Sequence, residues 1–281
     1  MKPVIVFISL MMMCCFCYTS QSKQLCQDSA ALVASPADQK HMMQVGEELE
    51  YSVHYSFFNI GVINFKITGM EVRNGRKVYF IHAVIESNPS LNWLKELHVK
   101  FYSEIDEDMF SYYWLGEDSS SRGINYTRMK FDYANNNMYY ESGKKISSDE
   151  YKPEKKKTVS ISSKCQDGVS LFFYARNFVH QDKTEHVPTY MDTLGLTTDL
   201  NFKNTLGKKE IDAVNYPLSV VYFDGHADFT GIFGLTGGFE GWFSNDDACI
   251  PIVAKMKVFL GSVRVELTKW KRNEWTPPQV H

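Results

Sequence analysis

The chain has 281 residues, a formal net charge of −3 and charged side chains at 22% of its positions, which are ordinary values for a globular protein. It has no basic excess and no arginine-rich stripe, so nucleic acid is excluded as an expected partner. Aromatic residues reach 14%, and they suit both β-strands and the lining of an apolar pocket.

Residues 1–22 have the pattern of a secretory signal peptide. Lys2 precedes an apolar run over Val4–Cys17, which is shorter than the roughly 20 residues that a membrane-spanning helix needs. Small and polar residues follow this run and supply a cleavage position. We therefore predict export to the periplasm or to the outside of the cell.

The cysteines inside this segment leave a second form of export open. Bulky methionines precede Cys14, and the residues before Cys17 also differ from the small residues that a lipoprotein signal places before its modified cysteine. Simple cleavage is therefore favoured. In the alternative, a lipid on Cys14, Cys15 or Cys17 anchors the protein at the outer membrane, and only then is it peripheral to a membrane.

Three cysteines, Cys26, Cys165 and Cys249, follow the signal peptide. In an oxidising compartment two of them can form one disulfide, and the alternative is that all three stay unpaired. No motif of a cysteine enzyme surrounds any of them, so catalysis by cysteine is not expected.

After a polar leader over residues 23–44, we predict a single β domain over residues 45–270. Apolar and polar residues alternate strictly over residues 48–57, which predicts the first strand. Asn74 and Gly75 form the strongest short signal of a hairpin. Short segments separated by polar turns continue at regular spacing beyond it, and this spacing predicts an antiparallel meander.

Two predicted helices and one predicted loop interrupt these strands. Ser90–Leu97 is predicted as a short helix. Gly143–Lys164 is rich in lysine and predicts a solvated connection between two halves of the sheet. Val169–Phe178 follows Asp167, a good N-cap candidate, and its apolar residues fall on one helical face. We expect this second helix to pack on the sheet.

The last strands are predicted over Gly237–Leu267. Two extended segments are joined by a polar turn at Ser244–Asp247, and the second segment is interpreted as one long strand that bends at Gly261. Residues 271–281 lack periodicity and predict a loose tail. The predicted fold class is mainly β: a large curved antiparallel sheet, as a half-barrel or open barrel, with one or two short helices packed on it.

No motif that carries a known chemistry is present. A nucleophile elbow, a P-loop, a dinucleotide-binding fingerprint and a His-Glu-x-x-His metal motif are all missing. Asp246 and Asp247 are interpreted as a turn, and the His, Asp and Glu residues within 180–186 as a polar loop, because neither has the ligand pattern of a cation site. We therefore predict no catalytic residue, no metal and no cofactor, and an enzyme with widely separated catalytic groups is the less favoured alternative.

Short pieces of sequence in a fixed order carry a resemblance to a known family. They are Gly46–Tyr51, Asn59–Gly61, Ser170–Arg176, Gly241–Ser244, Asp246 and Asp247, Ile250 and Pro251, and Val258–Ser262. Together they resemble a bacterial envelope family known only as domain of unknown function 3108, in its Bacteroidetes-type form. The resemblance implies an exported protein with a large, curved antiparallel sheet, similar in shape to the half-barrel lipoprotein carriers of the periplasm, and it supplies no catalytic residue.

Binding of an apolar ligand is the first functional expectation. Export, together with strands rich in Phe, Tyr and Trp, favours a trough that holds a lipid or a lipoprotein acyl chain beneath the helix over Val169–Phe178. The residues expected to contact such a ligand are Tyr55, Phe65, Phe101, Phe172, Trp242 and Phe259. The alternative is a structural or assembly protein of the cell envelope that binds a protein partner and has no ligand cavity. An envelope hydrolase is the third and least favoured reading.

Overall fold

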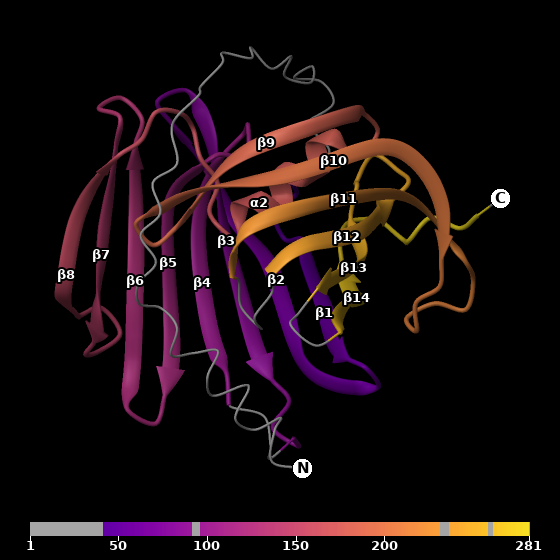
Figure 1. Cartoon of the computed structure of the whole chain (residues 1–281), viewed down its shortest axis with the longest axis horizontal. Helices are drawn as coiled ribbons and strands as arrows, with labels where there is room; N and C mark the ends of the chain where they lie inside the picture. Colours follow the sequence, from indigo (N-terminus) through magenta and orange to yellow (C-terminus); the bar gives the residue numbers. More distant parts are fainter. Residues whose placement is uncertain (1–41, 92–95, 231–235, 258–260, 281) are drawn as a thin grey trace.

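A computed structural model describes residues 42–91, 96–230, 236–257 and 261–280. The predicted signal peptide over residues 1–22, the predicted leader up to residue 41, and Cys14, Cys15, Cys17 and Cys26 lie outside these ranges. Within them the chain forms one large antiparallel sheet and one short helix (Figure 1). No helix of the described part is long and apolar enough to cross a membrane.

The first eight strands form one continuous meander in which each strand pairs with the next. They are β1 (Glu48–Tyr55), β2 (Phe58–Arg73), β3 (Arg76–Ser87), β4 (His98–Asp106), β5 (Ser111–Ser120), β6 (Gly123–Asp132), β7 (Asn137–Lys145) and β8 (Tyr151–Ser160). After β8 come the helix α2 (Ser170–Tyr174) and a 3₁₀ turn, η2 (Ala175–Phe178), which continues it.

A second meander follows the helix. Its strands are β9 (Asp182–Met191), β10 (Leu194–Lys209), β11 (Leu218–Thr230), β12 (Thr236–Ser244), β13 (Pro251–Lys257) and β14 (Ser262–Lys271). Pairing of β1 with β14 joins the two meanders into a 14-stranded sheet with β8 at one edge and β9 at the other. The sheet is not closed into a barrel. The predicted fold class, a large curved antiparallel sheet with a short helix packed on it, is therefore confirmed.

Side-chain alternation assigns each strand residue to one of two faces. On β1, the buried residues Leu49, Tyr51 and Val53 lie on the face that packs against α2, while Glu48 and Glu50 lie on the other. We call these the inner face and the outer face. The sheet curls so that the inner faces of both meanders enclose the helix (Figure 1).

The β2–β3 hairpin has the predicted turn chemistry. Asn74 and Gly75 both adopt positive φ, at 53° and 80°. Two successive positive φ values match the type I′ turn, whose twist suits the flanking strands. The hairpin predicted from these two residues is confirmed.

The predicted helix over Val169–Phe178 is confirmed, and Asp167 fixes its start. The Asp167 carboxylate accepts hydrogen bonds from the backbone N–H of Val169 (2.6 Å) and of Ser170 (2.8 Å). Its other oxygen accepts from the hydroxyls of Ser103 on β4 (2.7 Å) and Ser111 on β5 (2.6 Å). One buried side chain thus caps the helix and ties it to two strands.

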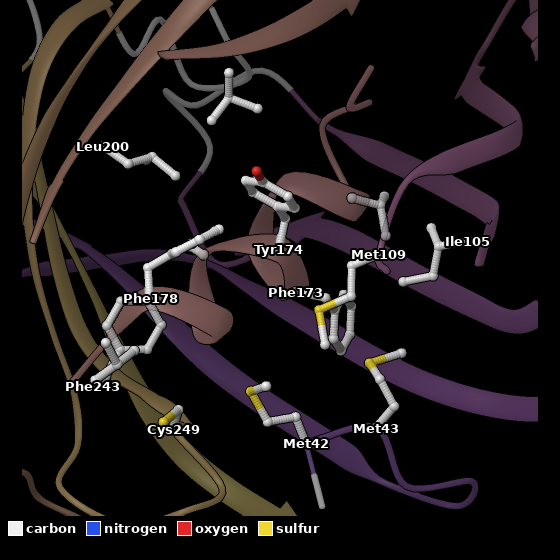
Figure 2. Close-up of a cluster of buried hydrophobic side chains, with 14 of the residues drawn as sticks. Met42, Met43, Ile105, Met109, Phe173, Tyr174, Phe178, Leu200, Phe243 and Cys249 are labelled. Carbon is white, nitrogen blue, oxygen red and sulfur yellow. The ribbon is translucent and has the colours of Figure 1, made fainter. Parts of the chain in front are cut away.

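The helix lies at the centre of the main core. Figure 2 shows Phe173 and Tyr174 of α2 with Phe178 of η2 among buried side chains from both meanders. The labelled neighbours are Met42, Met43, Ile105, Met109, Leu200, Phe243 and Cys249. The two halves of the sheet are therefore held together by one shared apolar cluster.

One loop prediction and one strand prediction were wrong. Gly143–Lys164 is not a loop, because β7 extends to Lys145 and β8 occupies Tyr151–Ser160. The segment after Pro251 is not one bent strand: Gly261, at φ 89°, precedes a return strand in which Val263 pairs with Met256. The helix predicted at Ser90–Leu97 lies largely outside the described residues.

The C-terminal segment is packed rather than loose. The Trp275 ring makes an edge contact with Trp270 at 5.8 Å between centroids. The backbone N–H of Ser219 donates to Pro278 O (2.8 Å), and that of Val280 donates to Pro217 O (3.0 Å). The prediction of a loose tail was wrong because these contacts join segments distant in sequence, and no local pattern announces them.

Candidate functional site

Three of the aromatic residues predicted to contact a ligand come together on the inner face. Phe65 on β2 stacks on Phe172 of α2, with ring centroids 4.2 Å apart and an angle of 12° between the rings. Phe101 on β4 stacks on Trp114 of β5 at 5.6 Å. Phe65 and Phe101 flank Ala83 of β3 in one cross-strand row. These phenylalanine rings are half-buried, so part of each remains accessible.

The other three predicted residues do not join this group. Tyr55 is on the inner face but at the far end of β1, beside Gly261. Trp242 is on the outer face, where it pairs with Tyr222 and carries the Lys209 ammonium 3.6 Å from its ring centroid. Alternation along β12 turns it away from Phe239 and Phe243, so it does not share a face with Phe65, Phe101 and Phe172. Phe259 lies outside the described residues.

A buried arginine lies at the end of the helix. The Arg176 guanidinium donates to Glu47 Oε1 (2.8 Å), to the carbonyl of Met42 (2.8 Å) and twice to the carbonyl of Ala248 (2.7 and 3.1 Å). Arg272, just after β14, donates to the other oxygen of Glu47 and to Met42 O. The side chains of Arg176 and Glu47 are 0% and 1% exposed, and that of Arg272 is 6% exposed. We call these three residues the Arg176 cluster.

The Arg176 cluster joins four separate parts of the chain. It connects the segment before β1, the helix, the β12–β13 turn and the segment after β14. Burial lowers the pKa of Arg176, but the adjacent Glu47 carboxylate raises it by more, so the pKa is raised overall. For Arg272 the effect of burial is the larger one, and the pKa is lowered. Both guanidinium groups stay charged at neutral pH because arginine titrates so high. Loss of one partner therefore leaves a buried charge without compensation.

The sequence pieces that carry the family resemblance meet at this cluster. Glu47 belongs to Gly46–Tyr51, Arg176 ends Ser170–Arg176, and Ala248 follows the Asp246 turn. Sequence reasoning missed the role of Arg176. The signal was present, because Arg176 follows Phe173 by three positions and so lies on the apolar side of the helix.

Asp246 orders the turn between β12 and β13. One carboxylate oxygen accepts from the Ser244 hydroxyl (2.7 Å) and from the backbone N–H of Ala248 and Cys249 (both 3.1 Å). The other accepts from the Trp275 indole N–H (2.7 Å). All these bonds come from the protein itself, and they agree with the interpretation of Asp246 as a turn residue.

The described cysteines are unsuited to nucleophilic chemistry. Cys165 and Cys249 are both buried and free. Burial raises the pKa of each thiol to about 12, so neither forms a thiolate near neutral pH. Cys26, the third cysteine considered for a disulfide, lies outside the described residues.

The predicted polar loop at residues 180–186 instead leads into β9. His186 lies on the outer face and bonds Asp199 of β10 (2.7 Å), while Glu185 lies on the inner face and accepts from the Tyr174 hydroxyl (3.3 Å). Strand alternation thus separates the side chains that a metal would have to gather. In the described ranges no three His, Cys, Asp or Glu residues are grouped to hold a metal ion.

Two depressions are present on the outer face. One, of about 790 Å³, lies over β1 and β14 and is lined mainly by polar groups, among them His54, Asp212 and Glu266. The other, of about 490 Å³, lies over β5–β8 beside the edge strand β8. Its lining side chains include Tyr113, Arg128, Lys130, Tyr139 and Lys156.

The fold and these clusters define a β-rich protein: an open antiparallel sheet curled around a helix that a buried arginine holds in place. The chain belongs to the family described as "Protein of unknown function (DUF3108)", whose family model matches residues 50–268. The membership inferred from the sequence pieces is confirmed. No curated protein matches the sequence.

Solved structures similar to the chain include two bacterial proteins. One is a β-barrel-like protein of domain of unknown function DUF1849 from Brucella abortus, with 11% identity, a TM-score of 0.47, and coverage of 82% of this chain and 98% of that chain. The other is a protein with a YmcC-like fold from Bacteroides fragilis, with 8% identity, a TM-score of 0.35, and coverage of 82% and 97%.

Proposed function

We propose that the protein is an exported binding protein that holds an apolar ligand, such as a lipid or a lipoprotein acyl chain, against the inner face of its sheet. The signal pattern of residues 1–22 supports export. The observation that carries ligand binding is the half-buried group of Phe65, Phe101 and Phe172 on the inner face. Accessible aromatic rings on the enclosed side of a curled sheet are the surface that an apolar ligand needs.

The ligand binds beside the helix and does not replace it. The helix is fixed by the Asp167 cap at its start and by Arg176 at its end, so its removal would expose a buried ion pair. The row of Phe65, Ala83 and Phe101 places a small residue between two rings. Ala83 itself is buried, so an acyl chain would lie against the accessible parts of the two rings beside it, without disturbing the Arg176 cluster.

Lipid analysis and probe binding test this proposal. The mature chain, purified without detergent, is expected to release a lipid or fatty acid on extraction and to bind a fluorescent fatty-acid probe with saturation. Phe101→Ser is expected to weaken probe binding by about tenfold, because one aromatic contact is lost. Tyr139→Ser, which changes an exposed ring on the outer face, is the matched control. Absence of both extracted lipid and saturable probe binding would overturn the proposal.

The alternative, an envelope assembly protein that binds another protein, is favoured by one specific feature. Strand β8 ends the sheet and is exposed along most of its length. Exposed sheet edges are recurring sites of protein recognition. In-cell crosslinking through residues of β8 is expected to capture one dominant protein in this case, whereas a purely ligand-binding role predicts no such product.

A further inference from the structure

Strand β8 is an edge with no second neighbour among the described strands. It lies at the edge of the sheet and pairs with β7 on one side (Figure 1). Residues 152–158 are all exposed. Both faces of this strand are therefore accessible, as is its outer backbone edge. Such an edge offers hydrogen-bonding groups to any extended chain that approaches it.

The register identifies which backbone groups are offered. The backbone N–H of Ile161 donates to Asn136 O (3.0 Å), and Val159 pairs with Met138 two positions along. Because bonded and non-bonded pairs alternate in an antiparallel ladder, Lys157 and Val159 direct their backbone groups toward β7. Lys156 and Thr158 therefore direct theirs away from the sheet.

Charge on this edge is strongly positive, although the whole chain carries −3. Within residues 152–158 the charged side chains are Lys152, Glu154, Lys155, Lys156 and Lys157. Lys155 lies 5.5 Å from the Tyr140 ring centroid on the inner face, and Lys156 lies 3.1 Å from Glu141 on the outer face. Lys157 has no carboxylate partner in the described part of the chain.

The depression of about 490 Å³ adjoins the groups that point outward. Its lining contains Lys130, Arg128 and Lys156, with Glu141 the acidic residue among them. Burial raises the pKa of Glu141, but hydrogen bonds from Tyr126, Lys156 and Arg128 lower it to about 2. Glu141 is thus occupied by its own neighbours, while the Lys130 ammonium has no ion pair with a described residue. The depression retains an excess of positive charge.

We infer that β8 is a docking edge for an acidic, extended segment of another protein, which adds to the sheet as a further strand. Its backbone would bond to Lys156 and Thr158, and its acidic side chains would face Lys156 on the outer face and Lys155 and Lys157 on the inner face. A second copy of β8 is a poor occupant, because lysines would then face lysines. The same charges that prevent self-pairing therefore select an acidic partner.

Peptide binding to the mature chain tests this inference. The probe is an eight-residue peptide with the repeat Glu-Glu-Val-Val, which places glutamates on both faces of an added strand, and the matched control replaces each glutamate by lysine. The acidic peptide is expected to bind with an affinity that falls as salt rises, and to shift the backbone amide signals of Lys156 and Thr158 in NMR spectra. The lysine peptide is expected not to bind.

Two variants separate strand addition from simple charge attraction. Thr158→Pro removes an N–H that points away from β7 and is expected to weaken binding by about tenfold, whereas Thr158→Val is expected to bind normally. Lys155→Glu with Lys157→Glu is expected to abolish binding while leaving the fold intact, because both side chains are exposed. Loss of binding in the charge-reversed variant with full binding by Thr158→Pro would overturn strand addition. So would failure of the acidic peptide to bind, or binding of the chain to phosphatidylglycerol vesicles in its place.

Discussion

The two edge strands of the sheet differ in what lies beside them. At β9, Gln166 forms a parallel bridge with Thr189: its N–H donates to Pro188 O (2.8 Å), and the Tyr190 N–H donates to Gln166 O (2.9 Å). At β8, no described segment takes this position. The chain that leaves β8 thus turns away from its own edge and covers part of the other one.

This difference follows from what each edge faces. β9 directs the buried residues Val187 and Thr189 into the core, so unpaired backbone groups there would be shielded from water and costly. β8 is exposed on both faces, so water satisfies its backbone and lysines keep other strands away. A sheet can thus remain open when one edge is covered by its own chain and the other is protected by charge.

The largest effect is expected from breaking the Arg176 cluster, which holds the helix that follows the covering segment. Arg176→Ala leaves Glu47 and two carbonyl groups buried without their main donor, and should cost about 3–5 kcal/mol of unfolding free energy. Denaturant unfolding measures this cost. Lys203→Ala, which breaks an exposed pair with Asp224, is the control and should cost less than about 1 kcal/mol. Equal losses in the two variants would contradict the assignment.

A slightly smaller effect is expected when the cover of β9 is removed. Gln166→Pro deletes the N–H that donates to Pro188 and should cost about 3 kcal/mol. Gln166→Ala keeps that N–H and should cost less. Hydrogen exchange should also become faster at Tyr190 in the proline variant. Unchanged exchange at this amide would show that the bridge does not protect β9.

The charged outer face beside β8 should make a smaller, pH-dependent contribution. The Glu141 pKa is lowered from 4.5 to about 2 in the folded state, so its stabilising contribution is present above pH 4.5 and is lost as pH falls toward 2. After allowance for solvent screening, we expect about 1 kcal/mol. The difference between the unfolding free energies at pH 6 and pH 3 should be larger by this amount in the natural chain than in Glu141→Gln. An identical pH dependence of the two proteins would exclude this role.

The smallest effect on stability is expected at the open edge itself. Thr158→Pro removes an N–H that bonds to no described strand, so the unfolding free energy should change by no more than about 0.5 kcal/mol. The contrast with Gln166→Pro is the sharpest form of the comparison, because the same substitution is made at each edge. A loss above about 2 kcal/mol would mean that Thr158 bonds to β7 and that the deduced alternation is wrong.

Strands with one buried face were predictable from sequence, and those without one were not. Alternation along β1 places Leu49 and Tyr51 inside, and the local pattern reports this directly. β8 has lysines on both faces and pairs with β7 as its one neighbouring strand, so its sequence resembles a loop. The turn at Gly261 was interpreted as a bend, because a glycine can adopt positive φ in a hairpin turn as well as at a bend within a strand. The local sequence does not distinguish the two.

The candidate sites were predictable only in part. Of the six residues to which the aromatic pattern pointed, Phe65, Phe101 and Phe172 lie together on one face, and their contact with a ligand stays a prediction. The pairing of Glu47 with Arg176 and Arg272 could not be predicted, because residues 129 and 225 positions apart meet only through the complete sheet. The accessible edge of β8 depends likewise on the strand order, which no local pattern fixes.

Pairing of β1 with β14 has a consequence for how the chain reaches its native state. Glu48 lies opposite Lys271, so the earliest strand cannot complete its hydrogen bonding until the latest one has been synthesised. Contacts between such distant residues carry a large loop-closure cost and slow folding. During synthesis the free edge of the β1–β2 hairpin therefore stays unpaired until β14 has been made.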